Sequence, residues 1–158
     1  MKDKKVPDEI ADFFRGQSFL VITTVDSNGT PHSSCKGLVD ISASGKVYLL
    51  DLYKGRTFNN LKNNPRINIT GVDEHKFKGY CLKGSAMISS VGELDPQILK
   101  AWEERITARI TQRVLKNVAG GKGHQYHPEA LLPKPEYLIS MQVEEIVDLS
   151  ARQSKKEG

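Results

Sequence analysis

The stretch DLYKGRTFNNLKNNPRINIT, residues Asp51 to Thr70, joins two predicted strands through a short predicted helix. KVYLLDL leads into it as a strand, and RINITGV, in which apolar and polar residues alternate, follows as another strand. TFNNLKNN can form two helical turns with Phe58 and Leu61 facing inward. Pro65 ends these turns because a proline disfavours helical backbone at the residue before it. The stretch therefore predicts a strand, a basic loop, a short helix and a second strand.

The basic loop has the chemistry of an anion-binding site. Thr57 is the predicted N-cap of the short helix, whose first-turn N–H groups carry partial positive charge and bind phosphate. Arg56 adds a planar fork that matches phosphate oxygens, and Gly55 lets the backbone come close to a ligand. Lys54 is a further basic group. Taken alone, such a loop is more often plain solvated surface, so the interpretation depends on the neighbouring strands.

Polar residues interrupt two of those strands. In TPHSSCKG the side chains of His32, Ser34 and Lys36 share one face, because side chains alternate along a strand. In YCLKGSA, Lys83 and Gly84 break an apolar run, and an interior glycine often marks a bulge or the close approach of a ligand or backbone. Polar groups on an inner face must meet water, each other or a ligand. Together these departures favour a polar ligand bound along strand faces.

The remaining elements complete a single mainly β domain over residues 1–158. Asn28-Gly29 favours a tight hairpin turn, so the first strands pair antiparallel, and strands of this number and length tend to close into a small barrel. Residues 1–17 form an N-terminal helix region, and residues 151–158 are expected to be a frayed tail. The predicted strands are 19–25, 31–41, 46–52, 66–72, 79–94 and 136–150, with a long helix capped by Asp95 and ended by Gly120 before the last of them.

Composition and charge indicate which kinds of molecule the chain could bind. The chain is 38% hydrophobic and 27% charged, and no apolar run approaches the roughly 20 residues of a membrane span. The first ten residues lack an apolar signal region, so we expect a cytoplasmic protein with reduced Cys35 and Cys81. A net charge of +4 suits an anionic small molecule about as well as nucleic acid. No arginine-rich arm or aromatic-interleaved basic run supports nucleic-acid binding, so we expect neither nucleic acid nor membrane as a partner.

The order of these pieces resembles the pyridoxamine 5'-phosphate oxidase-like family of FMN-binding split β-barrels. The matching segments run from about Ser18 to Val91 and are FLVITTVDSNGTPHSS, KVYLLDLYKGRTFNNLKNNPRINIT and YCLKGSAMI, of which the middle one is the most specific. The resemblance implies a six-stranded antiparallel split β-barrel with a short phosphate-loop helix and a long helix before the last strand. It also implies a homodimer with FMN in a groove at the subunit interface, and an oxidoreductase with an unknown small-molecule substrate.

The resemblance also implies which residues bind the FMN. The phosphate would be held by Lys54, Arg56 and Thr57. The isoalloxazine ring would lie along Ser33, Ser34, Cys35 and Lys36, with the strand end at Leu50, Asp51 and Leu52 and the strand at Lys83 and Gly84 approaching the cofactor. A positive group near N1 or O2 of the flavin stabilises its anionic reduced form, and Lys36 or Lys83 could supply it. Cys35 is either a reactive thiol near the flavin or, more commonly for a strand cysteine, buried.

Differences between this sequence and the family pattern bear on which reaction the protein could catalyse. True pyridoxamine-phosphate oxidases end in an arginine- and tryptophan-containing signature, whereas this chain ends IVDLSARQSKKEG and has its only tryptophan at Trp102. We therefore do not expect oxidation of pyridoxamine phosphate. The segment 95–135 is longer than a minimal FMN barrel needs, and we expect it to cover or border the flavin. Its His124 and His127 lack a third ligand for a metal; with Tyr126 they either line a substrate pocket or lie in a solvated loop.

Three alternatives remain open from the sequence. The chain could bind flavin without catalysis, as an electron carrier or a sensor. The same barrel also hosts haem-handling proteins, for which His32 or His75 would be the candidate iron ligand. It hosts deazaflavin-dependent proteins too, and deazaflavin carries a phosphate that Arg56 would bind equally well.

Overall fold

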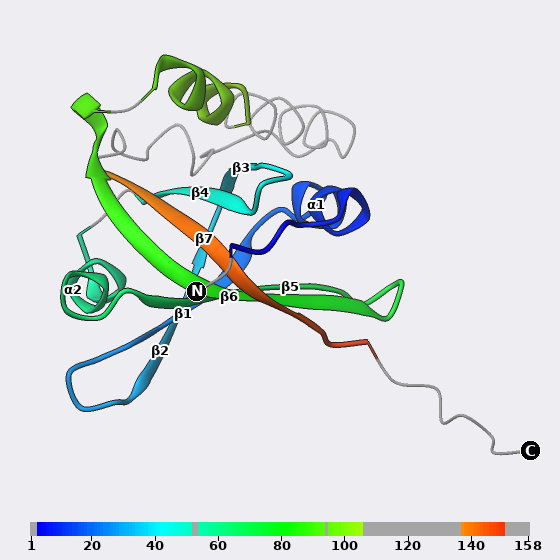
Figure 1. The fold of residues 1–158 in the computed structure, drawn as a ribbon, viewed down its shortest axis with the longest axis horizontal. Helices are drawn as coiled ribbons and strands as arrows, with labels where there is room; N and C mark the ends of the chain where they lie inside the picture. The colour runs from blue at the N-terminus through cyan, green and yellow to red at the C-terminus, as the bar shows by residue number, and fades with distance from the viewer. Residues whose placement is uncertain (1–2, 52–53, 94, 106–136, 151–158) are drawn as a thin grey trace, which may run out of the picture.

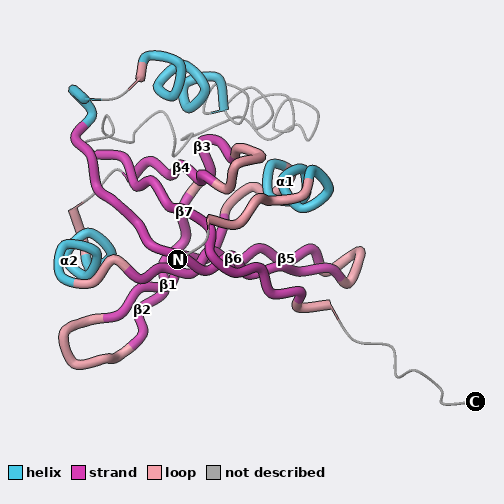
Figure 2. Tube along the Cα trace, viewed as in Figure 1, coloured by secondary structure: helices cyan, strands magenta, loops and turns pink. Residues whose placement is uncertain are grey.

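Seven antiparallel strands form one curled sheet in the computed structural model, which describes residues 3–51, 54–93, 95–105 and 137–150 (Figures 1 and 2). The strand order is β2-β1-β5-β6-β7-β4-β3. The strands are β1 (Leu20–Val25), β2 (Pro31–Lys36), β3 (Leu38–Ile41), β4 (Lys46–Asp51), β5 (Arg66–Asp73), β6 (Lys78–Ser90) and β7 (Tyr137–Asp148). The helices are α1 (Asp8–Arg15), α2 (Arg56–Asn63) and a 3-10 turn, η1 (Val91–Glu93), and residues 96–105 are also helical.

The predicted strand 31–41 divides at Gly37, which accounts for seven strands where six were expected. Its two halves, β2 and β3, follow each other in the chain but lie at opposite ends of the sheet order. A glycine weakens a strand and is typical of a sharp bend at a barrel corner. Because consecutive residues form both outer strands, the sheet has to curl back on itself. The mainly β, split-barrel fold predicted from the sequence is thus confirmed.

Alternating apolar residues fill the inside of this curl. Strand β4 buries Val47 and Leu49, and Ile139, Met141 and Val143 of β7 are fully buried beside them. Helix α1, which lies in the predicted N-terminal helix region 1–17, adds the buried Phe14 to the same core. Burial of these side chains is the main favourable term that holds the curl closed.

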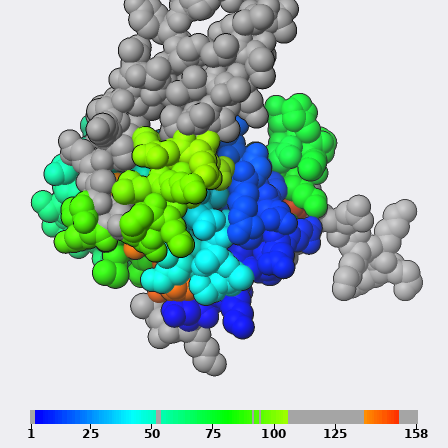
Figure 3. Space-filling view, turned by 90° about the horizontal axis from the view of Figure 1, so that it is seen from above, coloured from blue at the N-terminus to red at the C-terminus, as the bar shows by residue number. Residues whose placement is uncertain are grey.

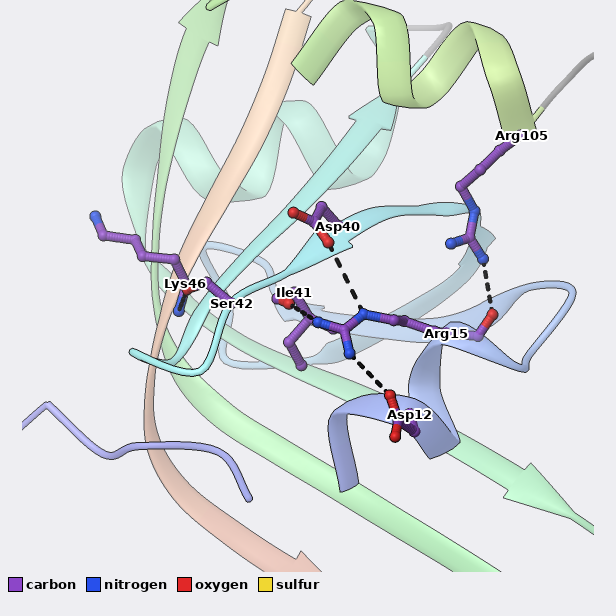
Figure 4. A network of polar contacts seen from close by, with 7 residues as sticks. All are labelled: Asp12, Arg15, Asp40, Ile41, Ser42, Lys46 and Arg105. Atoms are coloured by element: carbon purple, nitrogen blue, oxygen red, sulfur yellow. Dashed lines mark hydrogen bonds and ion pairs between the residues drawn. The ribbon is translucent and has the colours of Figure 1, made fainter. Parts of the chain in front are cut away.

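A polar network fastens α1 to the neighbouring elements (Figure 4). The Arg15 guanidinium donates to the Asp12 carboxylate 2.9 Å away and to the carbonyl oxygen of Ile41 in β3. Asp40, also in β3, lies 4.0 Å from the same guanidinium. The carbonyl oxygen of Arg15 in turn accepts a hydrogen bond of 3.0 Å from Arg105. Arg15 therefore links α1, β3 and the helical segment 96–105.

The helical segment 96–105 lies beside β3, β4 and α1 (Figure 3). As predicted, Asp95 caps it: the Asp95 carboxylate accepts a 2.9 Å hydrogen bond from the N–H of Gln97. Ile98 and Trp102 pack on a small cluster made of Val39, Leu50 and Leu138. The remaining predicted helix residues, and the loop with His124, Tyr126 and His127, lie outside the described residues. None of the described helices is long and apolar enough to cross a membrane.

Candidate functional site

Helix α2 begins at Arg56, and its N-cap is Gly55, two residues earlier than the predicted N-cap. Gly55 has the extended backbone of a cap (φ −93°, ψ −150°) and makes no side-chain capping bond. The prediction that Thr57 caps the helix is therefore wrong. Thr57 is the second helical residue, it is buried, and its hydroxyl lies 2.9 Å from the hydroxyl of Ser34 in β2. Because Thr57 itself lies within the helix, it is not the residue that caps it.

The start of α2 keeps the properties of an anion site. Its N-cap Gly55 brings no side chain to the first turn, and this turn holds no acidic residue. Arg56 and Lys54 are exposed at its start, and the Lys54 Nζ lies 5.6 Å from the centroid of the Phe58 ring. N–H groups at a helix start, with an exposed guanidinium beside them, form a donor set that fits a phosphate monoester. The residues present at α2 therefore suit the phosphate end of FMN.

The inner face of β2 carries the polar residues that the sequence placed together. His32, Ser34 and Lys36 are half-buried, whereas the alternate residues Pro31, Ser33 and Cys35 are exposed. The predicted shared face is thus confirmed. Since Ser34 contacts Thr57, this face of β2 lies directly against the start of α2.

Three residues from three strands form a polar cluster next to this contact. The Lys36 Nζ lies 2.7 Å from the Asp51 Oδ2, and the Tyr137 hydroxyl donates a hydrogen bond to the same oxygen. The Lys36 side chain is 15% exposed and that of Asp51 is 3% exposed. A buried carboxylate without a partner would cost several kcal/mol, so the lysine and the tyrosine are what permit an aspartate at this position. The Tyr137 ring also packs edge-on against Phe58 of α2, with 4.8 Å between the ring centroids.

Other predicted site residues lie away from this cluster. Ser33 and Cys35 are on the opposite face of β2, where the Ser33 hydroxyl lies 2.9 Å from that of Thr23. The expectation that Cys35 is buried is wrong, because alternation puts it on the exposed face. The Leu50 side chain packs with Val39 and Leu138, on the face of β4 opposite to Asp51. Leu52 lies outside the described residues.

Lys83 and Gly84 mark an irregularity in the pairing of β6 with β7, as the sequence suggested. The register shifts between these two residues. A Cβ atom on Gly84 would lie 1.9 Å from the carbonyl oxygen of Gln142, so the close approach that requires glycine here is by the β7 backbone. Lys83 is partly exposed and lies 3.8 Å from Glu145. The structure therefore favours Lys36 over Lys83 as the cation next to α2.

Sequence reasoning missed Tyr137 and a second link between α2 and the sheet. Asn60 of α2 donates a 3.0 Å hydrogen bond to the hydroxyl of Thr24 in β1, which is fully buried. Thr24 could have been found, because it follows Leu20 and Ile22 on the buried face of its strand, and a buried polar group needs a partner. Tyr137 gave no such signal, since its pairing with Asp51 joins segments 86 residues apart.

The sheet is a curled antiparallel half-barrel, and a helix with basic residues at its start lies against one of its strands. This is the architecture of the split-barrel class. The family model described as pyridoxamine 5'-phosphate oxidase matches residues 6–146, and the chain belongs to this family. No curated protein matches the sequence.

Solved structures share the fold at low sequence identity. HupZ from Group A Streptococcus is 22% identical with a TM-score of 0.61, covering 92% of this chain and 95% of its own. HutZ from Vibrio cholerae, described as a haem storage protein, is 22% identical with a TM-score of 0.53, covering 91% and 94%. A structure described as F420 reductase is 13% identical with a TM-score of 0.56, covering 90% and 98%. These likenesses concern the fold.

Proposed function

We propose that this chain binds FMN and uses it as an oxidoreductase on a small-molecule substrate. The single observation that supports this best is the basic start of α2 in a member of this family. Its N-cap is a glycine, Arg56 and Lys54 are exposed beside it, and Thr57 holds it against Ser34 of β2. The phosphate would bind at the start of α2 and the ring would lie along β2. The bound flavin would supply the redox chemistry, while the chain would bind and orient it and set the charge around the ring.

We propose further that the chain forms a homodimer in which a second copy covers the outer face of β1 and of β2, the strand along which the flavin ring would lie. Apolar side chains stand exposed there: Phe19 is 63% exposed and Val21 is 38% exposed. Val21 lies opposite Cys35 in the β1–β2 ladder, so both strands contribute to this face. Exposed apolar residues that gather on one sheet face are typical of a protein interface.

The FMN proposal is tested by comparing FMN with riboflavin, which lacks the phosphate. Wild-type protein is expected to take up FMN, with a flavin absorption spectrum, and to bind riboflavin more weakly. Arg56→Ala removes a charge-assisted hydrogen bond worth about 1.5–3 kcal/mol, so FMN affinity should fall by about 10- to 100-fold while riboflavin affinity stays the same.

The matched control is Lys76→Ala, which removes an exposed positive charge from the turn between β5 and β6, at the other end of β5 from α2 (Figure 1). It should leave both affinities unchanged. Protein that takes up no FMN contradicts the proposal, as does an Arg56→Ala variant that loses both flavins equally.

Turnover separates an enzyme from a carrier. Oxidation of NADH or NADPH by the FMN-loaded protein, with oxygen or an artificial acceptor, supports the oxidoreductase; no oxidation supports a non-catalytic electron carrier or sensor. Pyridoxamine phosphate is a further substrate to test in the same assay, and the sequence predicts that it is not oxidised.

Haem binding is the second candidate, favoured by the fold shared with HutZ. His32 is the better ligand candidate of the two named from the sequence, because it is half-buried on the inner face of β2, whereas the His75 side chain is 90% exposed. Haem added to the protein should then give a Soret band that His32→Ala abolishes. Mass spectrometry of the cofactor released from purified protein distinguishes FMN from haem and from a deazaflavin.

A further inference from the structure

The cluster of Lys36, Asp51 and Tyr137 joins the ends of three strands that are far apart in sequence. Lys36 ends β2, Asp51 ends β4 and Tyr137 begins β7. Asp51 and Tyr137 face each other in the β4–β7 ladder, so the backbone register fixes their distance. Lys36 reaches the same carboxylate oxygen from across the curl. One positive and one negative charge thus meet in a nearly buried place, and the pair is neutral overall.

This cluster lies beside the proposed flavin site. Ser34 contacts Thr57 at the start of α2, and Lys36 lies two residues farther along the same face, roughly 6.6 Å along the strand. The Tyr137 ring packs against Phe58 in the first turn of α2. The cluster is therefore next to the proposed phosphate position and on the strand along which the ring would lie.

A buried ion pair is a poor way to gain stability alone, because well-packed apolar residues of similar size often stabilise a fold as much or more. We propose that Asp51 and Tyr137 are positioning residues that hold the Lys36 ammonium at the end of β2 and offset its charge, and that this pair sets the relative affinity for reduced and oxidised FMN. The inference rests on the proposed function.

The sign of the effect follows from charge. Uptake of two electrons and one proton adds one negative charge to a flavin. The Lys36 cation alone favours that charge and the Asp51 carboxylate alone opposes it, so together they largely cancel. Lys36→Met should therefore weaken binding of reduced FMN relative to oxidised FMN, and Asp51→Asn should strengthen it.

The experiment is an anaerobic titration of FMN-loaded full-length protein with dithionite in the presence of a reference dye. Each single variant is expected to change the affinity ratio by about tenfold, in opposite directions, which corresponds to about 30 mV for a two-electron couple. The double variant Lys36→Met with Asp51→Asn should return close to wild type. Shifts in the same direction, or none in protein that still holds FMN, overturn the inference and leave the proposed function standing.

A second measurement needs no flavin and tests the role of Tyr137. In flavin-free full-length protein, the acylation rate of Lys36 is followed by mass spectrometry with Lys76 as the exposed internal reference. Tyr137→Phe keeps the ring against Phe58 but removes the hydroxyl that fixes the carboxylate, so Lys36 should be acylated several-fold faster. An unchanged Lys36 rate overturns the positioning role of Tyr137. If the wild-type protein binds no FMN, the proposed function and the flavin role of the pair are both overturned.

Discussion

Asp51 shows how far single residues can be read from the sequence. Strand alternation puts it on the same face of β4 as the buried Val47 and Leu49. The same rule predicted that Lys36 shares one face of β2 with Ser34, which is confirmed. The ion pair of Asp51 with Lys36 could not be predicted, because β2 and β4 are not neighbours in the sheet order and approach each other only across the curl. Periodicity gives the direction of a side chain within its strand, whereas a contact depends on how strands are placed in space.

The stability of the Lys36–Asp51 pair gives a prediction at this scale. Lys36→Met or Asp51→Asn alone should lower the free energy of unfolding by about 3 kcal/mol, because each removes a partner of a nearly buried pair. The double variant should lose much less than the sum of the two. Urea denaturation of all four proteins measures this coupling, and additive losses would show that the two residues act independently.

Gly84 gives a second residue-scale prediction. An alanine there would place its Cβ 1.9 Å from the backbone oxygen of Gln142, so β6 and β7 would have to separate. We expect Gly84→Ala to destabilise the protein by about 1–3 kcal/mol or more. Gly92→Ala is the control, because a Cβ at Gly92 meets no atom within 4 Å. Equal melting temperatures for the two variants would contradict this account.

Helix α2 illustrates the scale of an element. Its eight residues are too few to be stable as an isolated helix, so its position depends on contacts with the sheet. Leu61 was predicted to face inward and is buried; Asn60 and Thr57 add hydrogen bonds to β1 and β2. The sequence predicted the helix and its apolar face. It misplaced the N-cap because a threonine near a helix start can cap the helix or bond to another element, and local sequence does not decide which.

The Thr57–Ser34 bond is the testable link between this element and the site. Thr57→Val keeps the shape but leaves the Ser34 hydroxyl without this partner, so we expect a loss of about 1 kcal/mol and a several-fold weaker affinity for FMN. Ser44→Ala is the control, because it breaks an exposed hydroxyl pair with Ser42, 2.7 Å away, in the turn between β3 and β4 and should change stability by less than about 0.5 kcal/mol. Urea denaturation and FMN titration of both variants decide between these outcomes.

At the scale of the whole molecule, strand positions were predictable and their assembly was not. The hairpin signal at Asn28-Gly29 indicated the local antiparallel pair β1–β2, which the structure confirms. The pairing of β4 with β7 joins distant parts of the chain and leaves no local signal. The family resemblance supplied the split barrel, although the division of one strand at Gly37 was not foreseen.

The proposed dimer gives the prediction for the whole molecule. Wild-type protein should sediment as a dimer, and Val21→Asp should shift it to monomer and lower FMN affinity, because a charge would be buried on the outer face of β1. Val72→Asp introduces the same charge at an exposed valine near the far end of β5 and should leave the dimer intact. Sedimentation velocity measures both. A wild-type monomer, or dissociation by both variants, would contradict the proposed interface.

The break at Gly37 bears on how the barrel is kept shut. Gly37 joins β2 and β3, the two edge strands of the sheet, so one stretch of backbone holds both edges together. A circular permutant whose new ends lie at Gly37 and Leu38 would break this linkage and leave every strand pairing of the sheet intact. If the permutant still folds as a monomer, packing of the core alone is enough to curl the sheet. If instead it self-associates through β2 and β3, the linkage at Gly37 is what keeps these edge strands from pairing with other molecules.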